Sequence, residues 1–300
     1  PGAAWRWPAD ALGLGVVTVA CLATLLGMGW VLSRRWVSVV TALVMVAVVA
    51  RPPVTPGWPP REWVIAQCAV GQGDAIVLRA GPGQAVVVDT GPEPGLLETC
   101  LGQLGVVSVP LLVLTHYHAD HIGGRSAVWG RGVRLVLVSP FASPAAVATQ
   151  VRAEAAGVGA AVAEGRPGQR LAVGGVRWHT LGPVRVPRSG GAAPGEVGES
   201  SEENDASVVA MAEVGGFRVL LTGDVEPTGQ QALLRSGADL RADVLRVPHH
   251  GSGRQDEGFF RATGTGVALI GVGEDNDYGH PAAALLEALT GAGALVRRTD

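Results

Sequence analysis

The chain has 300 residues and a formal net charge of −3, which allows one large domain or two smaller ones. This charge excludes a broad basic surface that would coat nucleic acid without sequence preference, although it leaves room for a local basic groove. The three cysteines, at positions 21, 68 and 100, include no CxxC pair, which excludes a zinc ribbon. We expect Cys21 to act as a small apolar residue. We favour unpaired Cys68 and Cys100, and a disulfide between them stays open because the sequence cannot show one.

Two uncharged segments, residues 11–32 and 36–50, lie near the start of the chain. The first has the length of about 20 residues that a membrane-spanning helix needs. The second is short, but Arg35 and Arg51 at its ends can extend their side chains toward the membrane surfaces. Neither segment has a polar face, and two spans do not fit a signal peptide. We therefore predict a transmembrane helical hairpin over residues 1–50.

The arginines of this hairpin predict its orientation. Arg34 and Arg35 lie in the turn, and the positive-inside rule places such a turn in the cytoplasm. Everything after residue 51 would then lie on the extracytoplasmic side of the membrane. The sequence begins at Pro1 and not at Met, so we interpret it as part of a longer, multi-pass membrane protein.

A proline-rich linker is predicted over residues 51–61, because its five prolines prevent a helix and stiffen the chain. From residue 62 to 300, short β-branched runs alternate with helical stretches such as 144–156 and 281–289, which predicts a layered α/β sandwich. The predicted strands are 75–78, 85–88, 111–114, 135–138, 207–210, 218–221, 244–247 and 267–270. Residues 183–204 are rich in Gly, Pro, Ser and Glu and predict a mobile loop.

The first chemical motif directly follows the predicted strand 111–114. His116, His118, Asp120 and His121 fall within six positions, and two glycines come shortly after them. His116 and His118 are two residues apart, so extended backbone points both to one side, while Asp120 and His121 come as the chain turns toward a helix. Imidazole and carboxylate suit Zn²⁺ or Mn²⁺, so we predict a metal site here and not a loop of solvated histidines.

Two later motifs repeat the pattern of a strand followed by ligand-type residues. Asp224 follows the strand 218–221, and we predict that it bridges two ions, which a two-metal centre holds about 3.5–4 Å apart. His249, His250 and Ser252 follow the strand 244–247. Adjacent side chains diverge, so we assign His249 to the metal and His250 to substrate or to support of the ligands. The opposite assignment stays open.

Other polar residues are predicted to support the ligands or to contact substrate. Asp89 follows the strand 85–88 and could orient a ligand histidine. Asn204, Ser207, Ser252 and His280 could place an amide, a hydroxyl or an imidazole at the site. By contrast, His179 lies in a strand-like segment and is not expected to bind metal.

Taken together, these motifs resemble those of the metallo-β-lactamase superfamily, and within it those of the C-terminal domain of the ComEC family, the inner-membrane DNA-uptake channel of natural competence. The motifs are residues 70–75 (VGQGDA), 89–91 (DTG), 116–121 (HYHADH), 221–224 (LTGD), 249–252 (HHGS) and 278–281 (YGHP). The resemblance covers residues 62–300, and the upstream hairpin resembles the last helices of the channel.

The resemblance implies an αββα sandwich that binds two divalent ions. It also implies a nuclease that degrades one strand of incoming DNA, with single-stranded DNA as the expected substrate and other components of the uptake machinery as partners. Two departures stand out. Position 69 is Ala where the family usually has Asp, and the superfamily's usual third histidine before Asp224 is not evident. The ion held by His116 and His118 would then be completed by Asn204, water or substrate.

As a mechanism, we expect Asp120, Asp224 and His250 to take part in hydrolysis, with bound ions lowering the pKa of a water molecule to about 7 and neutralising phosphoryl charge. His280 is an alternative to His250 as the group that protonates the leaving oxygen. Two other functions stay open, because a fold does not name its substrate. One is a phosphodiesterase or esterase for another substrate, and the other is a non-catalytic domain that guides DNA to a channel.

Overall fold

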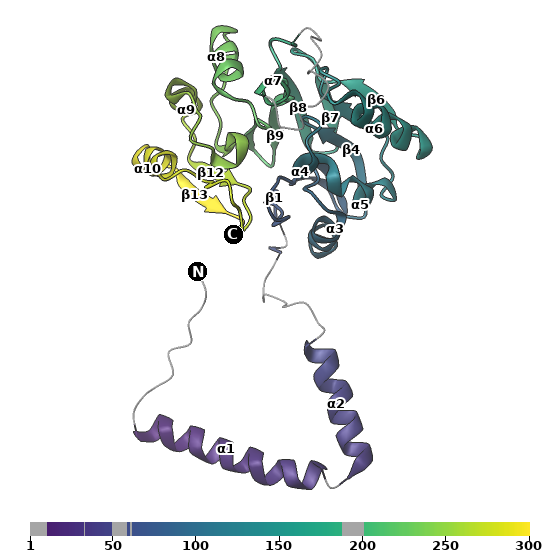
Figure 1. Cartoon of the computed structure of the whole chain (residues 1–300), viewed down its shortest axis with the longest axis vertical. Coiled ribbons are helices and arrows are strands. Elements are labelled where there is room, and N and C mark those ends of the chain that lie inside the picture. The colour runs from purple at the N-terminus through teal and green to yellow at the C-terminus, as the bar shows by residue number, and fades with distance from the viewer. Residues whose placement is uncertain (1–10, 33, 50–58, 61, 188–200) are drawn as a thin grey trace. The chain divides into compact units, whose positions relative to one another are not determined.

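The computed structural model describes residues 11–32, 34–49, 59–60, 62–187 and 201–300. The chain divides into two compact units, Pro1–Trp58 and Pro59–Asp300, which Figure 1 shows. The predicted linker, residues 51–61, lies almost wholly outside the described residues. The boundary between the two units falls at its end.

In the described residues of the first unit there are two helices, α1 (Ala11–Leu32) and α2 (Arg35–Val49). They cover the two segments that were predicted to be helical. Among the residues that the structure describes, no helix is both long enough and apolar enough to cross a membrane. The helices are therefore confirmed, whereas the predicted transmembrane hairpin is not.

The first sheet of the second unit has the strand order β1-β2-β3-β4-β5-β6. Strand β2 pairs antiparallel with both β1 and β3, and β3, β4, β5 and β6 run parallel to one another. The strands are β1 (Ile65–Gln67), β2 (Ile76–Gly81), β3 (Gln84–Val88), β4 (Ser108–Leu114), β5 (Leu135–Val138) and β6 (Ala161–Glu164). The parallel strands therefore all end at the same edge.

The second sheet has the order β13-β12-β11-β10-β9-β8-β7. Its strands β10, β11, β12 and β13 are parallel, and β7, β8 and β9 are attached in antiparallel fashion. The strands are β7 (Arg170–Val173), β8 (Val176–Gly182), β9 (Val209–Val214), β10 (Phe217–Leu221), β11 (Val244–Arg246), β12 (Val267–Ile270) and β13 (Leu295–Arg298).

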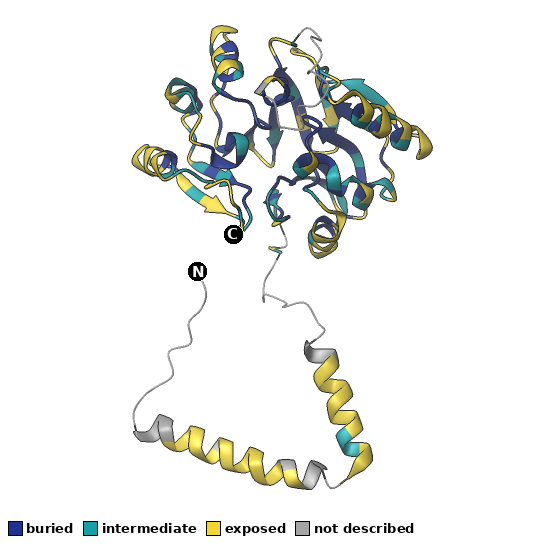
Figure 2. Cartoon of the chain, viewed as in Figure 1, coloured by how far each residue is buried: buried dark blue, intermediate teal, exposed yellow. Residues whose placement is uncertain are grey.

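The helices of the second unit cover the outer faces of the two sheets (Figure 1). Against the first sheet lie α3 (Pro94–Gln103), α4 (Ala119–Ile122), α5 (Ser126–Trp129) and α6 (Ala145–Gly157). Against the second lie α8 (Pro227–Arg235), α9 (Glu257–Thr263) and α10 (Ala283–Gly291). Figure 2 shows the consequence for burial: the central strands are buried, edge strands such as β13 are partly exposed, and the helices expose their outer sides.

Alternating side chains divide the apolar residues into three layers. In β4, Leu112 and Leu114 pack under the helices of the first sheet, whereas Leu111 and Val113 face the second sheet. This is the two-residue period of a strand that is buried on both faces. Because the same pattern recurs across both sheets, the second unit is the predicted αββα sandwich.

All eight predicted strands are present, with boundaries shifted by a few residues. Strands β1, β6, β7 and β13 were not predicted, and β8 was expected only as the strand-like segment around His179. Part of the loop predicted over residues 183–204 is wrong, because α7 (Ser201–Asp205) occupies its end. Residues 188–200 of that loop lie outside the described residues.

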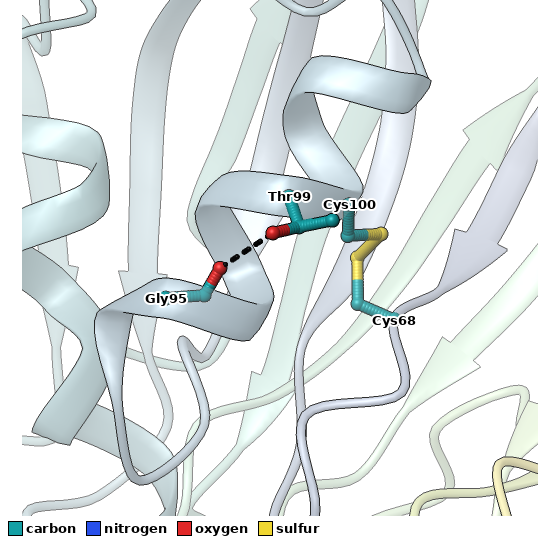
Figure 3. The surroundings of a disulfide bond; sticks show 4 residues. All are labelled: Cys68, Gly95, Thr99 and Cys100. Carbon is teal, nitrogen blue, oxygen red and sulfur yellow. Dashed lines mark hydrogen bonds between the residues drawn. A yellow bond between two sulfur atoms is a disulfide. The ribbon is translucent and has the colours of Figure 1, made fainter. Parts of the chain in front are cut away.

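The expectation that Cys68 and Cys100 are unpaired is wrong, because they form a disulfide (Figure 3). Cys100 lies on α3, and Cys68 lies in the loop between β1 and β2, with the two Cα atoms 5.9 Å apart. Figure 3 also shows the first turns of α3, where Thr99 Oγ1 donates to the Gly95 carbonyl at 2.9 Å. The disulfide thus ties the loop that leads to Asp74 to a helix on the outer face of the first sheet.

Replacing both cysteines (Cys68→Ser with Cys100→Ser) is expected to lower the free energy of unfolding of the second unit. The two positions are 32 residues apart. Without the cross-link the unfolded chain gains conformational entropy, which lowers the free energy of unfolding by about 3–4 kcal/mol for a loop of that length. Guanidinium denaturation of the full chain measures the change. Cys21→Ser, which alters an exposed free cysteine, is the matched control, and equal stability of the two variants would contradict this expectation.

Candidate metal centre

The residues singled out from the sequence converge on the edge where the parallel strands of both sheets end. Asp89 follows β3, and His116 comes two residues after β4. From the second sheet, Asp224 follows β10 and His250 follows β11. Carboxyl ends of parallel strands are where α/β sheets place their ligands, so two sheets with facing edges bring distant parts of the chain together.

His116 and His118 face one point. Nε2 of His116 lies 3.1 Å from Nδ1 of His118. The opposite nitrogens have other partners: Nδ1 of His116 lies 3.1 Å from Thr115 Oγ1, and Nε2 of His118 lies 2.7 Å from the Glu203 carboxylate. The two nitrogens that face each other are therefore the ones available to a shared ion. Glu203 was not identified from the sequence.

A second group gathers Asp120, His121, Asp224 and His250. Nε2 of His121 lies 3.5 Å from Asp120 Oδ2 and 3.2 Å from Asp224 Oδ2. Nε2 of His250 lies 2.9 Å from Asp120 Oδ2 and 3.4 Å from Asp224 Oδ2. Ligands of a tetrahedral zinc ion, at bond lengths of about 2.0–2.1 Å, are about 3.3 Å apart. The four atoms thus have the spacing of one coordination shell.

The outer nitrogens of these two imidazoles are also engaged. Nδ1 of His121 lies 2.9 Å from Asp89 Oδ2, and Nδ1 of His250 lies 2.9 Å from the Gly271 carbonyl. A hydrogen bond at one ring nitrogen fixes the tautomer and leaves the other nitrogen free for a metal. Asp89 itself is held by the Thr115 backbone N–H and hydroxyl, both at 2.8 Å. It therefore occupies the orienting position that the sequence predicted for it.

The electrostatics of the centre are dominated by buried carboxylates. Burial lowers the pKa of His121, but the carboxylates around it, chiefly Asp224, raise that pKa well above its usual value. Burial, with His121 nearby, lowers the pKa of His116 well below its usual value. A proton on His121 therefore balances part of the negative charge, and an ion that binds has to displace it.

Backbone strain is concentrated at this edge. Among the described residues, the three non-glycine residues with positive φ are Asp89 (57°), His249 (49°) and His250 (52°). Such conformations cost about 1–3 kcal/mol each and persist where the surroundings enforce them, often at functional sites. The turn at His249 and His250 aims the second ring, and not the first, at Asp224.

Unpartnered polar atoms fit a bound cation. Six buried side-chain nitrogen or oxygen atoms lack a hydrogen-bond partner in the described part of the chain. Five of them belong to residues of this edge: four are His121 Nε2, Asn204 Oδ1, His249 Nδ1 and His280 Nδ1, and the fifth, Asp74 Oδ2, forms no hydrogen bond but contacts the Arg246 guanidinium. Orphaned buried polar atoms are rare in folded proteins. Donors of this kind, at the carboxylate and imidazole spacings above, suit divalent ions.

The assignment of the metal to His249 does not match this geometry. Its Nε2 lies 4.0 Å from Asp224 Oδ2, and its Nδ1 lies 3.4 Å from Glu226. His250 takes the inner place instead, so the alternative assignment is the one that the geometry favours. The positive φ of both residues, which no side-chain pattern reveals, decides their order.

The remaining predicted residues lie around the centre. Ser207 Oγ lies 3.4 Å from Nδ1 of His116, and the Asn204 amide donates to Glu226 at 3.1 Å. The His280 ring lies 5.6 Å from that of His249. Ser252 Oγ accepts from the Arg254 backbone N–H, and the Ser252 backbone N–H donates to the His249 carbonyl at 2.8 Å. His179 lies on β8 and pairs in register with Met211 of β9.

Asp74 and Arg246 were not predicted as site residues. Both are buried, and Asp74 is grouped with His121, Asp224 and His250 as a residue able to hold an ion. Asp74 ends the Gly-rich stretch before β2, and Arg246 is the last residue of β11. Burial lowers the pKa of Arg246 to about 9, so it stays charged at neutral pH.

Comparison with known proteins gives the family. The metallo-beta-lactamase superfamily model matches residues 68–132. The chain is 31% identical over 254 residues to ComE operon protein 3 of Bacillus subtilis. The aligned region covers 77% of this chain and 31% of that protein. It is 26% identical over 254 residues to Competence protein ComA of Neisseria gonorrhoeae, which covers 81% and 32%.

The chain carries a ComEC-type metallo-β-lactamase-like domain. It spans about a third of the length of these curated relatives. Among solved structures, CmlA, a diiron β-hydroxylase from Streptomyces venezuelae, superposes with a TM-score of 0.52 at 17% identity. That match covers 80% of this chain and 53% of CmlA, and it shows a shared fold alone.

Asp89→Asn is expected to weaken binding of Zn²⁺ or Mn²⁺ by about 10–100-fold, because an amide no longer accepts from His121 in the same way. Asn tolerates the positive φ at this position, so the fold should be kept. Competition with a chromogenic chelator measures the affinity. Glu213→Gln, which alters an exposed carboxylate paired with Arg177, is the control. Equal affinity in both variants would remove the orienting role of Asp89.

Metal binding is expected to release the proton from His121. Its pKa is raised, so below that pKa an ion competes with a proton, and the apparent affinity should fall by up to about tenfold for each pH unit lost. Calorimetric titration in buffers of different ionisation enthalpy counts the protons released. An affinity that does not change with pH, with no proton released, would contradict a protonated His121.

Proposed function

We propose that this domain is a metal-dependent phosphodiesterase that cleaves one strand of DNA during its uptake through a membrane channel. The comparisons identify a domain of the metallo-beta-lactamase superfamily with competence proteins among its relatives, and the cleavage of DNA is our proposal. The observation that carries the finer proposal is the pair of ligand groups beside Asp224. One is made by His116 with His118, and the other by residues that face Asp224 Oδ2.

In this proposal the chain's residues divide into three roles. The two imidazole and carboxylate groups bind two divalent ions, Zn²⁺ or Mn²⁺, and the ions would lower the pKa of water and neutralise phosphoryl charge. Asp89 and Glu203 fix the ring tautomers of His121 and His118. His249, whose side chain is 15% exposed and lies beside His280, would contact a phosphate or the leaving oxygen.

Burial lowers the pKa of His280, which keeps its imidazole neutral near neutral pH. A neutral imidazole can donate from one nitrogen and accept at the other. The ring of His280 lies beside that of His249, 5.6 Å away. We assign His249 and His280 to substrate, and not His250, because the Nε2 of His250 faces Asp120 and Asp224.

A membrane setting is also part of the proposal. The described side chains of α1 and α2 include many exposed apolar ones, such as Leu26 (79% exposed) and Leu43 (63%). Exposed apolar surface of this kind needs a partner, and a lipid bilayer supplies one. The Cys68–Cys100 disulfide suits an oxidising compartment, which supports the extracytoplasmic side of the plasma or inner membrane. Other DNA-uptake components are proposed as partners there.

A second candidate function is a DNA-guiding domain that does not hydrolyse. The observation that favours it is the missing third histidine beside His116 and His118. The buried Asn204 Oδ1 lacks a hydrogen-bond partner and is the available oxygen ligand near α7. An amide oxygen binds zinc more weakly than an imidazole does, so a loosely held first ion is consistent with either function.

The proposed activity is tested with the purified full chain, stripped of metal and supplied again with Mn²⁺ or Zn²⁺. We expect cleavage of single-stranded DNA that exceeds cleavage of a small bis-aryl phosphodiester. Asp224→Asn and His116→Ala should each lower the rate by more than about a hundredfold. This loss exceeds the roughly 10–100-fold expected when a residue that only hydrogen-bonds to a ligand is replaced. Asp239→Asn, which alters an exposed carboxylate, should leave the rate unchanged.

The other outcomes separate the alternatives. Cleavage of the small phosphodiester alone would favour a different substrate. A tightly bound ion with no hydrolysis of any nucleic acid would favour the DNA-guiding function. Full metal-stimulated cleavage by Asp224→Asn would show that Asp224 does not bridge the ions.

A further inference from the structure

Arg246 is a buried cation inside a site that is proposed to bind cations. It is the last residue of β11, and its side chain is only 3% exposed. A buried guanidinium is stable only when its donors are paired, because an unpaired buried charge is costly. The partners of the guanidinium therefore show which carboxylates of the site it neutralises.

The guanidinium holds one oxygen of Asp224. Its two terminal nitrogens lie 3.1 and 3.2 Å from Asp224 Oδ1, and one of them also donates to the Gly223 carbonyl. The other oxygen, Oδ2, lies 3.2 Å from Nε2 of His121. The two oxygens of this carboxylate thus have separate partners, and one alone faces the imidazoles.

The same guanidinium also contacts Asp74 Oδ2. The other oxygen of Asp74, Oδ1, accepts from Gln67 Nε2 at 3.2 Å. Asp74 lies on the outer side of the His250 ring, 3.2 Å from Nδ1, whereas Asp120 and Asp224 meet the same ring at Nε2. It is also 4.0 Å from Nε2 of His121, farther than Asp120 or Asp224. Asp74 is thus placed behind the ligand atoms.

We propose that Arg246 is a positioning residue that pairs with Asp74 and holds Oδ1 of Asp224, which leaves Oδ2 as the oxygen of Asp224 that a bound ion would meet, and that Asp74 is a counter-ion and not a ligand. This inference rests on the metal site of the proposed function, but on no particular substrate. A forked guanidinium suits the role because it can hold two carboxylates at once in fixed directions.

The proposal predicts how charge and coordination respond to substitution. Asp74→Asn removes one of the two carboxylates that balance Arg246, and the additional net positive charge repels a divalent ion. Arg246→Met removes that repulsion and frees Asp224 Oδ1. The double variant has the same net charge as the native centre. If Asp74 were itself a ligand, the double variant would lack that ligand and would bind as weakly as Asp74→Asn.

The experiment is Co²⁺ titration of the purified full chain, because the visible absorption of Co²⁺ reports its ligands without any assay of activity. We expect Asp74→Asn to weaken Co²⁺ binding by at least about tenfold with an unchanged spectrum. Arg246→Met should bind at least as tightly as the native chain, with an altered spectrum. The double variant should return to within about threefold of the native affinity. Arg241→Met, an exposed arginine, is the matched control.

Two outcomes would overturn the proposal. A changed spectrum in Asp74→Asn, with no recovery in the double variant, would make Asp74 a ligand while leaving the proposed hydrolysis intact. Failure of the native chain to bind Co²⁺ at all would contradict both the positioning role of Arg246 and the proposed metal-dependent hydrolysis. If Arg246→Met does not fold, Arg246→Lys keeps the charge but not the fork, and it should still alter the spectrum because one ammonium cannot hold both carboxylates. An unchanged spectrum in Arg246→Lys would contradict the positioning role.

Discussion

The structure of this edge depends on the need to compensate buried carboxylates. Asp74, Asp89 and Asp224 are each almost wholly removed from solvent. All three carboxylates lie within 4.0 Å of a nitrogen of the His121 ring. Burial of an ionised carboxylate is costly unless it is paired and hydrogen-bonded. Here the compensation comes from imidazoles on two sheets and one guanidinium, so both halves of the sandwich must be in place. The fold and the charge arrangement are therefore parts of one constraint.

The same constraint explains why the ligand residues come from distant parts of the chain. No single loop could bury several carboxylates and their cations without a core around them. The three apolar layers supply that core, and the parallel strands β3, β4, β10 and β11 all release their polar residues at the same edge. The disulfide then fixes the loop that leads to Asp74 from the outside.

Much of this was predictable from the sequence, and what was not has physical reasons. Buried strands such as β4 carry continuous apolar runs, so they were found. Strands β6, β7 and β13 lie toward or at sheet edges with partly exposed side chains, and β1 has three residues, so their apolar signal is weak. The Cys68–Cys100 pair depends on long-range contact. The order of His249 and His250 depends on a backbone conformation that residue types do not reveal.

The left-handed backbone at His249 and His250 has a consequence for the evolution of the domain. Histidine is a costly occupant of that conformation, whereas Gly or Asn would relieve the strain. Substitutions that stabilise the fold are thus available at the very positions that line the centre, and selection for stability alone would erode it. Two adjacent histidines in this conformation therefore lower the stability of the fold while placing their rings beside the centre.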